Sequence, residues 1–180
     1  MRDPLGYYRN NTVNSRALIE TAVKHGVRHF IFSSTAAVYG NPERMPVRED
    51  DRTVPTSPYG SSKLMTEIML RDAGAAHGLR HVILRYFNVA GADPLRPHRS
   101  VHQGATHLIK VAVEAALGRR PKLDVFGTDY PTPDGTCIRD YIHVSDLVAR
   151  AFRRARLSAR RRRLRRRSIA ATAAVSPCST

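Results

Sequence analysis

The chain has 180 residues, of which 30 are Lys or Arg and 15 are Asp or Glu, so its formal net charge at pH 7 is +15. That length corresponds to one domain, and a composition of 42% hydrophobic and 25% charged residues excludes a collagen, a coiled coil and a wholly disordered chain. The excess charge is local, because residues 150–167 contain 11 arginines and no acidic residue, and +15 less these 11 leaves +4 for the rest, so net charge is a poor guide to function.

The first third of the chain alternates between helix and strand signals. Apolar residues recur at a spacing near 3.6 over residues 8–25, and Gly26 follows, so this segment predicts an amphipathic helix. Residues 27–34 form a short apolar run rich in β-branched and aromatic side chains, which predicts a buried strand of a parallel sheet. Residues 40–58 contain four prolines among charged residues and predict a loop.

The same alternation continues through the middle of the chain. Residues 59–76 predict a helix that ends before Gly78, and residues 81–88 predict a second buried strand. Helix, strand, loop, helix and strand in this order indicate an α/β fold with a parallel sheet. Residues 103–118 predict a further helix and residues 123–126 a short strand.

The character of the sequence changes after Ala149. Residues 150–167 are mostly arginine with scattered small or aliphatic residues, and residues 168–180 are small residues without an aromatic side chain. Segments of this composition do not bury a core. We therefore expect a partial α/β domain over residues 1–149 and a basic, disordered, low-complexity tail over residues 150–180.

Other features exclude further classes of protein. The two cysteines, Cys137 and Cys178, cannot build a disulfide framework or a four-ligand zinc site. The histidines lack the spacing of metal ligands, so we expect no metal. No run of about 18 apolar residues occurs, and the N-terminus lacks the apolar stretch of a secretory signal. We therefore expect a cytoplasmic protein without a membrane partner.

Polar side chains lie where the predicted strands and helices meet. Residues 33–35, Ser-Ser-Thr, end the first strand, Tyr59 and Lys63 open the following helix, and Asn88 ends the second strand. Ligands of open parallel sheets bind beyond the carboxyl ends of the strands. We therefore expect these side chains to face a single crevice.

The spacing of Tyr59 and Lys63 suits acid–base chemistry. Residues four positions apart lie on one face of a helix, about 5–6 Å apart at Cβ. A lysine ammonium beside a phenol favours the phenolate, which lets a tyrosine act as a base near neutral pH, and a hydroxyl of Ser34 or Thr35 could bridge to a substrate oxygen. The alternative is a chance pair on an exposed helix turn, because the pattern is short.

Five segments together resemble the UDP-glucose 4-epimerase family, which belongs to the extended short-chain dehydrogenases/reductases. The resemblance extends over about residues 4–149, and its last two segments distinguish this family from most of its relatives. The segments are residues 32–40 (FSSTAAVYG), 57–64 (SPYGSSKL), 84–88 (LRYFN), 125–136 (VFGTDYPTPDGT) and 138–144 (IRDYIHV).

The resemblance implies an NAD-dependent isomerase of galactose metabolism that interconverts UDP-glucose and UDP-galactose at C4. The fold it implies is a partial Rossmann-like, doubly wound parallel sheet with part of a small substrate-binding domain. The implied partners are NAD as the cofactor, a UDP-hexose as the substrate and a second copy of the chain in a homodimer. Nucleic acid is expected to bind only nonspecifically, if at all.

Residue by residue, the resemblance assigns catalytic roles to Tyr59, Lys63 and Thr35. Tyr59 matches the base that takes the proton of the sugar 4-hydroxyl, and Lys63 matches the lysine that binds the nicotinamide ribose and favours the phenolate. Thr35 matches a Ser or Thr that hydrogen-bonds the sugar hydroxyl. Tyr59 and Lys63 also belong to the implied cofactor site, together with Asn10 and Phe87.

Three positions, Asn88, Phe126 and Arg139, match residues that hold the UDP part of the substrate, so together with Thr35 they form the implied substrate site. An arginine fork suits a diphosphate, and an asparagine side chain both donates and accepts hydrogen bonds. From the residues alone, Phe126 could equally be a core residue of the short predicted strand, and Arg139 could form a surface ion pair with Asp140.

The resemblance has a gap at each end. The glycine-rich turn that binds the pyrophosphate of a dinucleotide has no counterpart in these residues, and the match stops at Ala149, so we expect a chain truncated at its N-terminus and divergent after Ala149. Two alternatives remain open: another nucleotide-sugar epimerase or dehydratase, and an inactive fragment whose arginine-rich tail binds nucleic acid nonspecifically. Dehydratases usually carry an acid pair where Ala36 and Ala37 follow Thr35.

Overall fold

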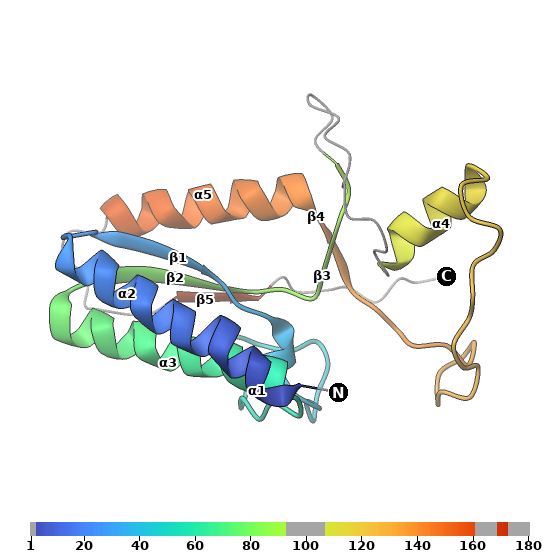
Figure 1. Ribbon diagram of the computed structural model, residues 1–180, viewed down its shortest axis with the longest axis horizontal. Coiled ribbons are helices and arrows are strands. Elements are labelled where there is room, and N and C mark those ends of the chain that lie inside the picture. Colours follow the sequence, from blue (N-terminus) through green and yellow to red (C-terminus); the bar gives the residue numbers. More distant parts are fainter. Residues whose placement is uncertain (1–2, 93–106, 161–168, 173–180) are drawn as a thin grey trace. The chain divides into compact units, whose positions relative to one another are not determined.

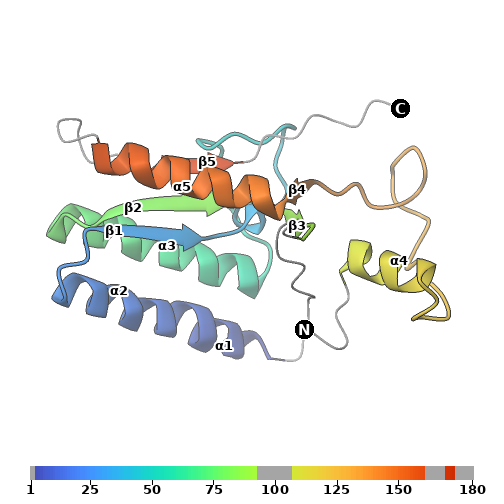
Figure 2. The same ribbon diagram turned by 90° about the horizontal axis from the view of Figure 1, so that it is seen from above.

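A computed structural model of the chain describes residues 3–92, 107–160 and 169–172. The chain divides into two compact units, residues 1–87 with 146–180 and residues 88–145. Both units combine helices with parallel strands (Figures 1 and 2). The predicted α/β class, a partial Rossmann-like parallel sheet, is confirmed.

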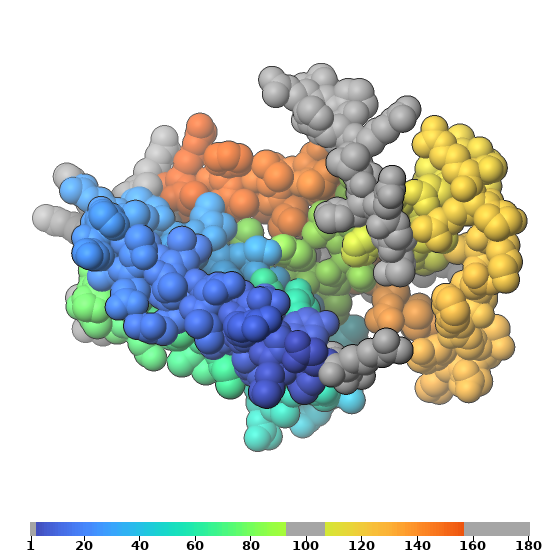
Figure 3. Space-filling view, viewed as in Figure 1, coloured from blue at the N-terminus to red at the C-terminus, as the bar shows by residue number. Residues whose placement is uncertain are grey.

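The first unit opens with one long helical segment. It comprises α1 (Pro4–Tyr7), a π-helical stretch (Tyr8–Val13) and α2 (Asn14–Lys24). Asp3 caps the start, since its Oδ1 accepts a hydrogen bond from the backbone N–H of Gly6 at 2.8 Å. The segment lies at the surface of its unit, where it is drawn in blue (Figure 3), and it confirms the helix predicted from the apolar periodicity.

Three parallel strands form the sheet of the first unit: β1 (His29–Ser33), β2 (Arg80–Arg85) and β5 (Ile169–Thr172). Their order is β1-β2-β5, so β2 is central. Phe32 of β1 lies opposite Ile83 of β2. Both predicted strands are present, and β2 is buried as expected although it ends at Arg85 rather than at residue 88. The prediction that the first strand is buried is wrong, because Phe32 is the only buried residue of β1.

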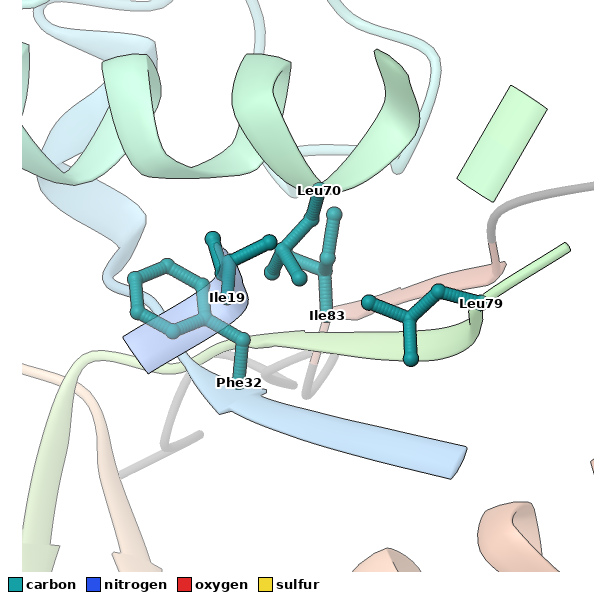
Figure 4. Packing of buried hydrophobic residues seen from close by; sticks show 5 residues of the cluster. All are labelled: Ile19, Phe32, Leu70, Leu79 and Ile83. Atoms are coloured by element: carbon teal, nitrogen blue, oxygen red, sulfur yellow. The ribbon is translucent and has the colours of Figure 1, made fainter. Parts of the chain in front are cut away.

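The helix α3 (Pro58–His77) connects β1 to β2. It begins where the Ser57 side chain accepts a hydrogen bond from the backbone N–H of Gly60, with Pro58 in the first turn, and it ends at Gly78, which adopts a left-handed conformation with φ of 72°. The helix packs on the sheet through a cluster of five buried residues, shown in Figure 4: Ile19, Phe32, Leu70, Leu79 and Ile83.

A further helix, α5 (Val144–Arg160), lies along the opposite face of the sheet from α2 and α3 (Figure 1). It runs without a break through the predicted domain boundary at residues 149 and 150. The expected disorder of the tail is therefore wrong for residues 150–160, and also for β5. Ala, Leu and Arg are strong helix formers, and the edge of β2 offers unpaired backbone groups to a further strand. The other tail residues lie outside the described ranges.

The second unit contains a two-stranded parallel sheet and one helix. Strands β3 (Asn88–Ala90) and β4 (Tyr141–His143) pair so that Asn88 lies opposite Tyr141. The helix α4 (Leu108–Ala116) confirms the later part of the predicted helix 103–118. Residues 103–106 of that prediction lie outside the described part of the chain.

The strand predicted over residues 123–126 is wrong. Residues 122–127 have no regular secondary structure, and the Phe126 side chain is 89% exposed. A short apolar run forms a strand only where a neighbouring backbone can pair with it, and that partner is decided by the fold rather than by the run itself. The interpretation of Phe126 as a core residue is wrong for the same reason.

Candidate functional site

The carboxyl end of β1 turns directly into a short 3₁₀ helix (Ala36–Tyr39). Thr35 is extended and buried at 9% exposure, and its Oγ1 accepts a hydrogen bond from the backbone N–H of Ala37 at 3.2 Å. The threonine therefore caps this turn at the end of the strand. Its position at the end of β1 is the one that the sequence predicts for residues 33–35.

The first turn of α3 lies directly against this 3₁₀ helix because of one glycine. A Cβ built on Gly60 would lie 2.6 Å from the carbonyl oxygen of Ala37 and 2.9 Å from Cβ of Pro55. Only a residue without a side chain allows this approach. Gly60 thus brings the helix turn that carries Tyr59 against the turn that Thr35 caps.

The Lys63 side chain reaches from α3 to the end of β1. Its Nζ donates a hydrogen bond to the backbone carbonyl of Ser33 at 3.0 Å. The same nitrogen lies 5.2 Å from the centre of the Phe32 ring and 6.0 Å from that of Tyr59. Burial lowers the pKa of the Lys63 ammonium below its ordinary value. The structure therefore places the Lys63 ammonium beside the Tyr59 ring, and both side chains are half-buried.

Tyr59 and Asn10 line one open pocket of about 310 Å³, together with Asp3, Gly6, Tyr7 and Asn11. The Tyr7 ring meets the Tyr59 ring edge-on, with 6.0 Å between the ring centres. Asn10 lies in the π-helical stretch, a geometry that is frequent at functional sites. The pocket thus joins an implied catalytic residue to an implied cofactor residue.

Hydrogen bonds hold the π-helical stretch against α3. Nδ2 of Asn11 donates to Oγ of Ser62 at 3.0 Å, and the Thr12 hydroxyl donates to the Ser62 carbonyl at 3.3 Å. Ser62 lies between Tyr59 and Lys63 in sequence and is fully buried. These bonds therefore hold the wall that carries Asn10 against the helix that carries Tyr59.

Phe87 lies just beyond the end of β2. It is half-buried and packs on the buried cluster that includes Ala36, Val38 and Tyr39. The preceding residue, Tyr86, accepts a backbone hydrogen bond from Ala36 at 3.0 Å. Phe87 is therefore placed near the turn that Thr35 caps.

The implied substrate residues Asn88, Phe126 and Arg139 belong to the second unit. Nδ2 of Asn88 donates to the Asp140 carbonyl at 2.9 Å, which leaves its amide oxygen for other donors. Arg139 is exposed, and among the described residues no ion pair joins it to Asp140, whose pKa is raised by burial. Phe126 and Arg139 thus present their side chains to solvent rather than to a core.

Sequence reasoning missed two residues that adjoin this site, Glu67 and Arg85. Glu67 is fully buried on α3, and its carboxylate accepts hydrogen bonds from the guanidinium of Arg85 in β2 and from the hydroxyl of Ser34. One signal was available: Glu67 follows Lys63 by four positions, so it lies on the same helix face. Nothing local in the sequence indicates that Arg85 is its partner.

The described residues contain neither a metal-binding cluster nor a helix that could span a membrane. No group of three or more His, Cys, Asp or Glu side chains in those ranges could hold a metal ion. None of the helices in the same ranges combines the length and the apolar character that a membrane crossing needs.

The chain is similar to a known protein family. Residues 1–163 match the model of the "NAD dependent epimerase/dehydratase family". The chain is 69% identical over 145 residues to a UDP-glucose 4-epimerase of Azospirillum brasilense, a match that covers 81% of this chain and 42% of that protein. The chain thus spans less than half of the length of this curated relative.

Two solved structures resemble the chain in fold as well. A UDP-glucose 4-epimerase from Stenotrophomonas maltophila, with bound NAD and formylated UDP-arabinopyranose, has a TM-score of 0.84 and 37% identity, covering 95% of this chain and 50% of that one. A UDP-glucose 4-epimerase from Bifidobacterium longum in complex with NAD⁺ and UDP has a TM-score of 0.77 and 36% identity, with the same coverage of both chains.

Proposed function

Because the chain belongs to the NAD dependent epimerase/dehydratase family, we propose that it carries the catalytic segment of an epimerase that inverts C4 of UDP-hexoses with NAD. One observation carries this proposal: Tyr59 and Lys63 lie on one face of α3, and Lys63 reaches the carbonyl of Ser33 at the end of β1. The Azospirillum brasilense relative supports the epimerase reading over other reactions of the family.

The residues at this end of the sheet fit NAD. The open pocket between Asn10 and Tyr59 offers an amide and a phenol to a polar ligand, and the ammonium of Lys63 can donate to ribose hydroxyls. We assign Asn10, Tyr59, Lys63 and Phe87 to the cofactor site. When bound, NAD supplies a hydride acceptor and donor for C4 of the sugar.

The proton of the sugar 4-hydroxyl is transferred by residues of the chain itself. Tyr59 as phenolate takes the proton of the 4-hydroxyl and returns it after the sugar has turned its other face to the cofactor. The Lys63 ammonium stabilises the phenolate by its charge. The Thr35 hydroxyl, fixed by its bond with the N–H of Ala37, orients the sugar hydroxyl.

The second unit supplies the groups that we assign to the UDP part of the substrate. The guanidinium of Arg139 is exposed and suits a diphosphate by its planar fork. The amide oxygen of Asn88 accepts no hydrogen bond from the residues that the structure describes, so a donor of the nucleotide can bind there. Phe126 exposes an aromatic face on which a base can stack.

A chimera tests the proposal. The 145 matched residues of the Azospirillum brasilense relative are replaced by those of this chain, and UDP-galactose is incubated with the purified chimera. We expect UDP-glucose as the product, and loss of that product in a Tyr59→Phe chimera. A dehydrated sugar nucleotide would favour a dehydratase instead, and a folded chimera without any turnover would contradict the proposal.

A further inference from the structure

The first unit contains a buried carboxylate that no step of the proposed reaction uses. Glu67 is fully buried, and its two oxygens accept hydrogen bonds from Arg85 at 2.5–3.2 Å, from Arg71 at 3.0 Å and from the Ser34 hydroxyl at 2.6 Å. Arg85 is almost as deeply buried. Two charges buried in this way need partners on every side, and the structure supplies them.

The position of Glu67 relates it to the candidate site. Tyr59, Lys63 and Glu67 follow one another at intervals of four along one face of α3. Lys63 bonds to the carbonyl of Ser33, and Glu67 bonds to the hydroxyl of Ser34, the next residue of the same strand end. Two successive turns of the helix thus hold two successive residues that precede Thr35.

Arg85 also contacts the 3₁₀ helix and the segment that leads to α3. Its Nη1 donates to the Tyr39 hydroxyl at 3.0 Å and to the Glu49 carbonyl at 3.4 Å, and its guanidinium lies 4.9 Å from the centre of the Tyr39 ring. Tyr39 ends the 3₁₀ helix that Thr35 begins, and Glu49 lies in the segment that leads to α3. One ion pair therefore contacts the end of β1, the 3₁₀ helix and the segment that leads to α3.

We propose that Glu67, held by Arg85, is a positioning residue: through the Ser34 hydroxyl it fixes the end of β1 against α3 and so sets where Thr35 and Lys63 lie. The catalytic meaning of that position rests on the proposed function. The geometric part does not, because it concerns only contacts within the first unit.

The test uses the chemical reactivity of Lys63 in the 180-residue chain. The chain has only four lysines, at positions 24, 63, 110 and 122, so acetylation of each is separable by mass spectrometry, with the exposed Lys24 as the internal reference. Labelling is followed across alkaline pH for the parent chain, Ser34→Ala and Glu67→Gln. Arg71→Met is the matched control, because it removes the half-exposed partner of the same carboxylate and leaves Arg85 and Ser34 in place.

We expect Ser34→Ala and Glu67→Gln to raise severalfold the plateau labelling rate that Lys63 reaches at high pH, because its amine becomes more accessible. The midpoint of its labelling curve should move to higher pH, because the ammonium loses burial. Arg71→Met should leave the curve unchanged. Leu79→Ala, which weakens the core away from the network, corrects for loss of stability alone. The positioning role is overturned if Ser34→Ala labels like the parent, or if Leu79→Ala changes the curve as much as Ser34→Ala does.

This experiment separates the two proposals. The labelling needs neither NAD nor a UDP-hexose. If the chimera is inactive but the 180-residue chain shows the expected labelling pattern, the proposed function is rejected and the placement by Glu67 is retained. If the chimera is active but Ser34→Ala does not change the labelling of Lys63, only the positioning role is rejected. Ser34→Ala removes a single hydroxyl, so it decides the matter even where Glu67→Gln does not fold.

Discussion

The Tyr59 hydroxyl and the Lys63 ammonium have separable roles at the proposed site. Tyr59→Phe in the chimera should lower turnover by about 10²–10⁴-fold, the usual worth of a positioned acid–base group, while UDP-sugar binding stays nearly unchanged. Lys63→Met should weaken NAD binding and move the pH optimum upward, because the phenol loses the charge that favours its ionised form. Steady-state kinetics across pH measure both effects, and near-normal turnover of Tyr59→Phe would disprove the assigned role.

The buried ion pair between Glu67 and Arg85 should affect the stability of the chain. Arg85→Met leaves the fully buried carboxylate without its main partner, so we expect the free energy of unfolding to fall by about 3–5 kcal/mol. The double variant Glu67→Met with Arg85→Met removes both charges, so its free energy of unfolding should fall clearly less than that of Arg85→Met alone. Urea unfolding of the parent, Glu67→Met, Arg85→Met and the double variant measures this, and additive losses would show that the two charges do not depend on each other.

Burial of the His81 imidazole should make the stability of the chain depend on pH. Its Nε2 is buried and has no hydrogen-bond partner among the residues that the structure describes. Burial lowers the pKa of His81 below its ordinary 6.5, and the charge of Arg71 adds to this. The folded chain therefore binds this proton less readily than the unfolded chain, so the contribution to stability is complete above pH 6.5 and is lost as pH falls through the two pKa values.

Unfolding in urea at about pH 8 and about pH 5 tests this sign. The parent chain should lose more stability on acidification than His81→Gln, which cannot take up the proton. His77→Gln, at the exposed end of α3, is the matched control and should behave as the parent does. Equal acid sensitivity of the parent and His81→Gln would contradict the prediction.

At the scale of elements, the contact between α3 and the 3₁₀ helix depends on Gly60. A Cβ at this position meets the backbone carbonyl of Ala37 at 2.6 Å, so Gly60→Ala must displace the first turn of α3. We expect a loss of about 1–3 kcal/mol in unfolding free energy, as for other overpacked sites, together with reduced turnover in the chimera. Ser61→Ala is the control, because it adds no atom, and a stabilised Gly60→Ala chain would refute the close contact.

At the scale of the whole molecule, charge predicts binding to polyanions. Replacing the 11 arginines of residues 150–167 by Gln lowers the net charge from +15 to +4. The parent chain should bind heparin or DNA at low salt, with log affinity falling by about 0.7–0.9 per phosphate contact per unit of log salt, and the variant should not bind. Binding retained by the variant would place the polyanion site in the rest of the chain.

Local patterns predicted the elements well where the signal is contained in the element itself. The 3.6-residue period, the Ser57 cap and Gly78 define α3, and the apolar runs define β1 and β2. The predictions failed where pairing with another strand decides whether a segment becomes a strand. Residues 123–126 have the composition of a strand without a paired neighbour, whereas β5 pairs with β2 despite its low-complexity surroundings.

The sequence by itself determined that Tyr59 and Lys63 share a helix face and that residues 33–35 follow a strand, because spacing along one element sets those relations. Only the tertiary structure decided that Lys63 reaches the Ser33 carbonyl, that Gly60 lets α3 approach Ala37, and that Arg85 pairs with Glu67. Each of these contacts joins two different elements. No periodicity within either element specifies which residue of the other it will meet, since packing selects that partner when the whole unit folds.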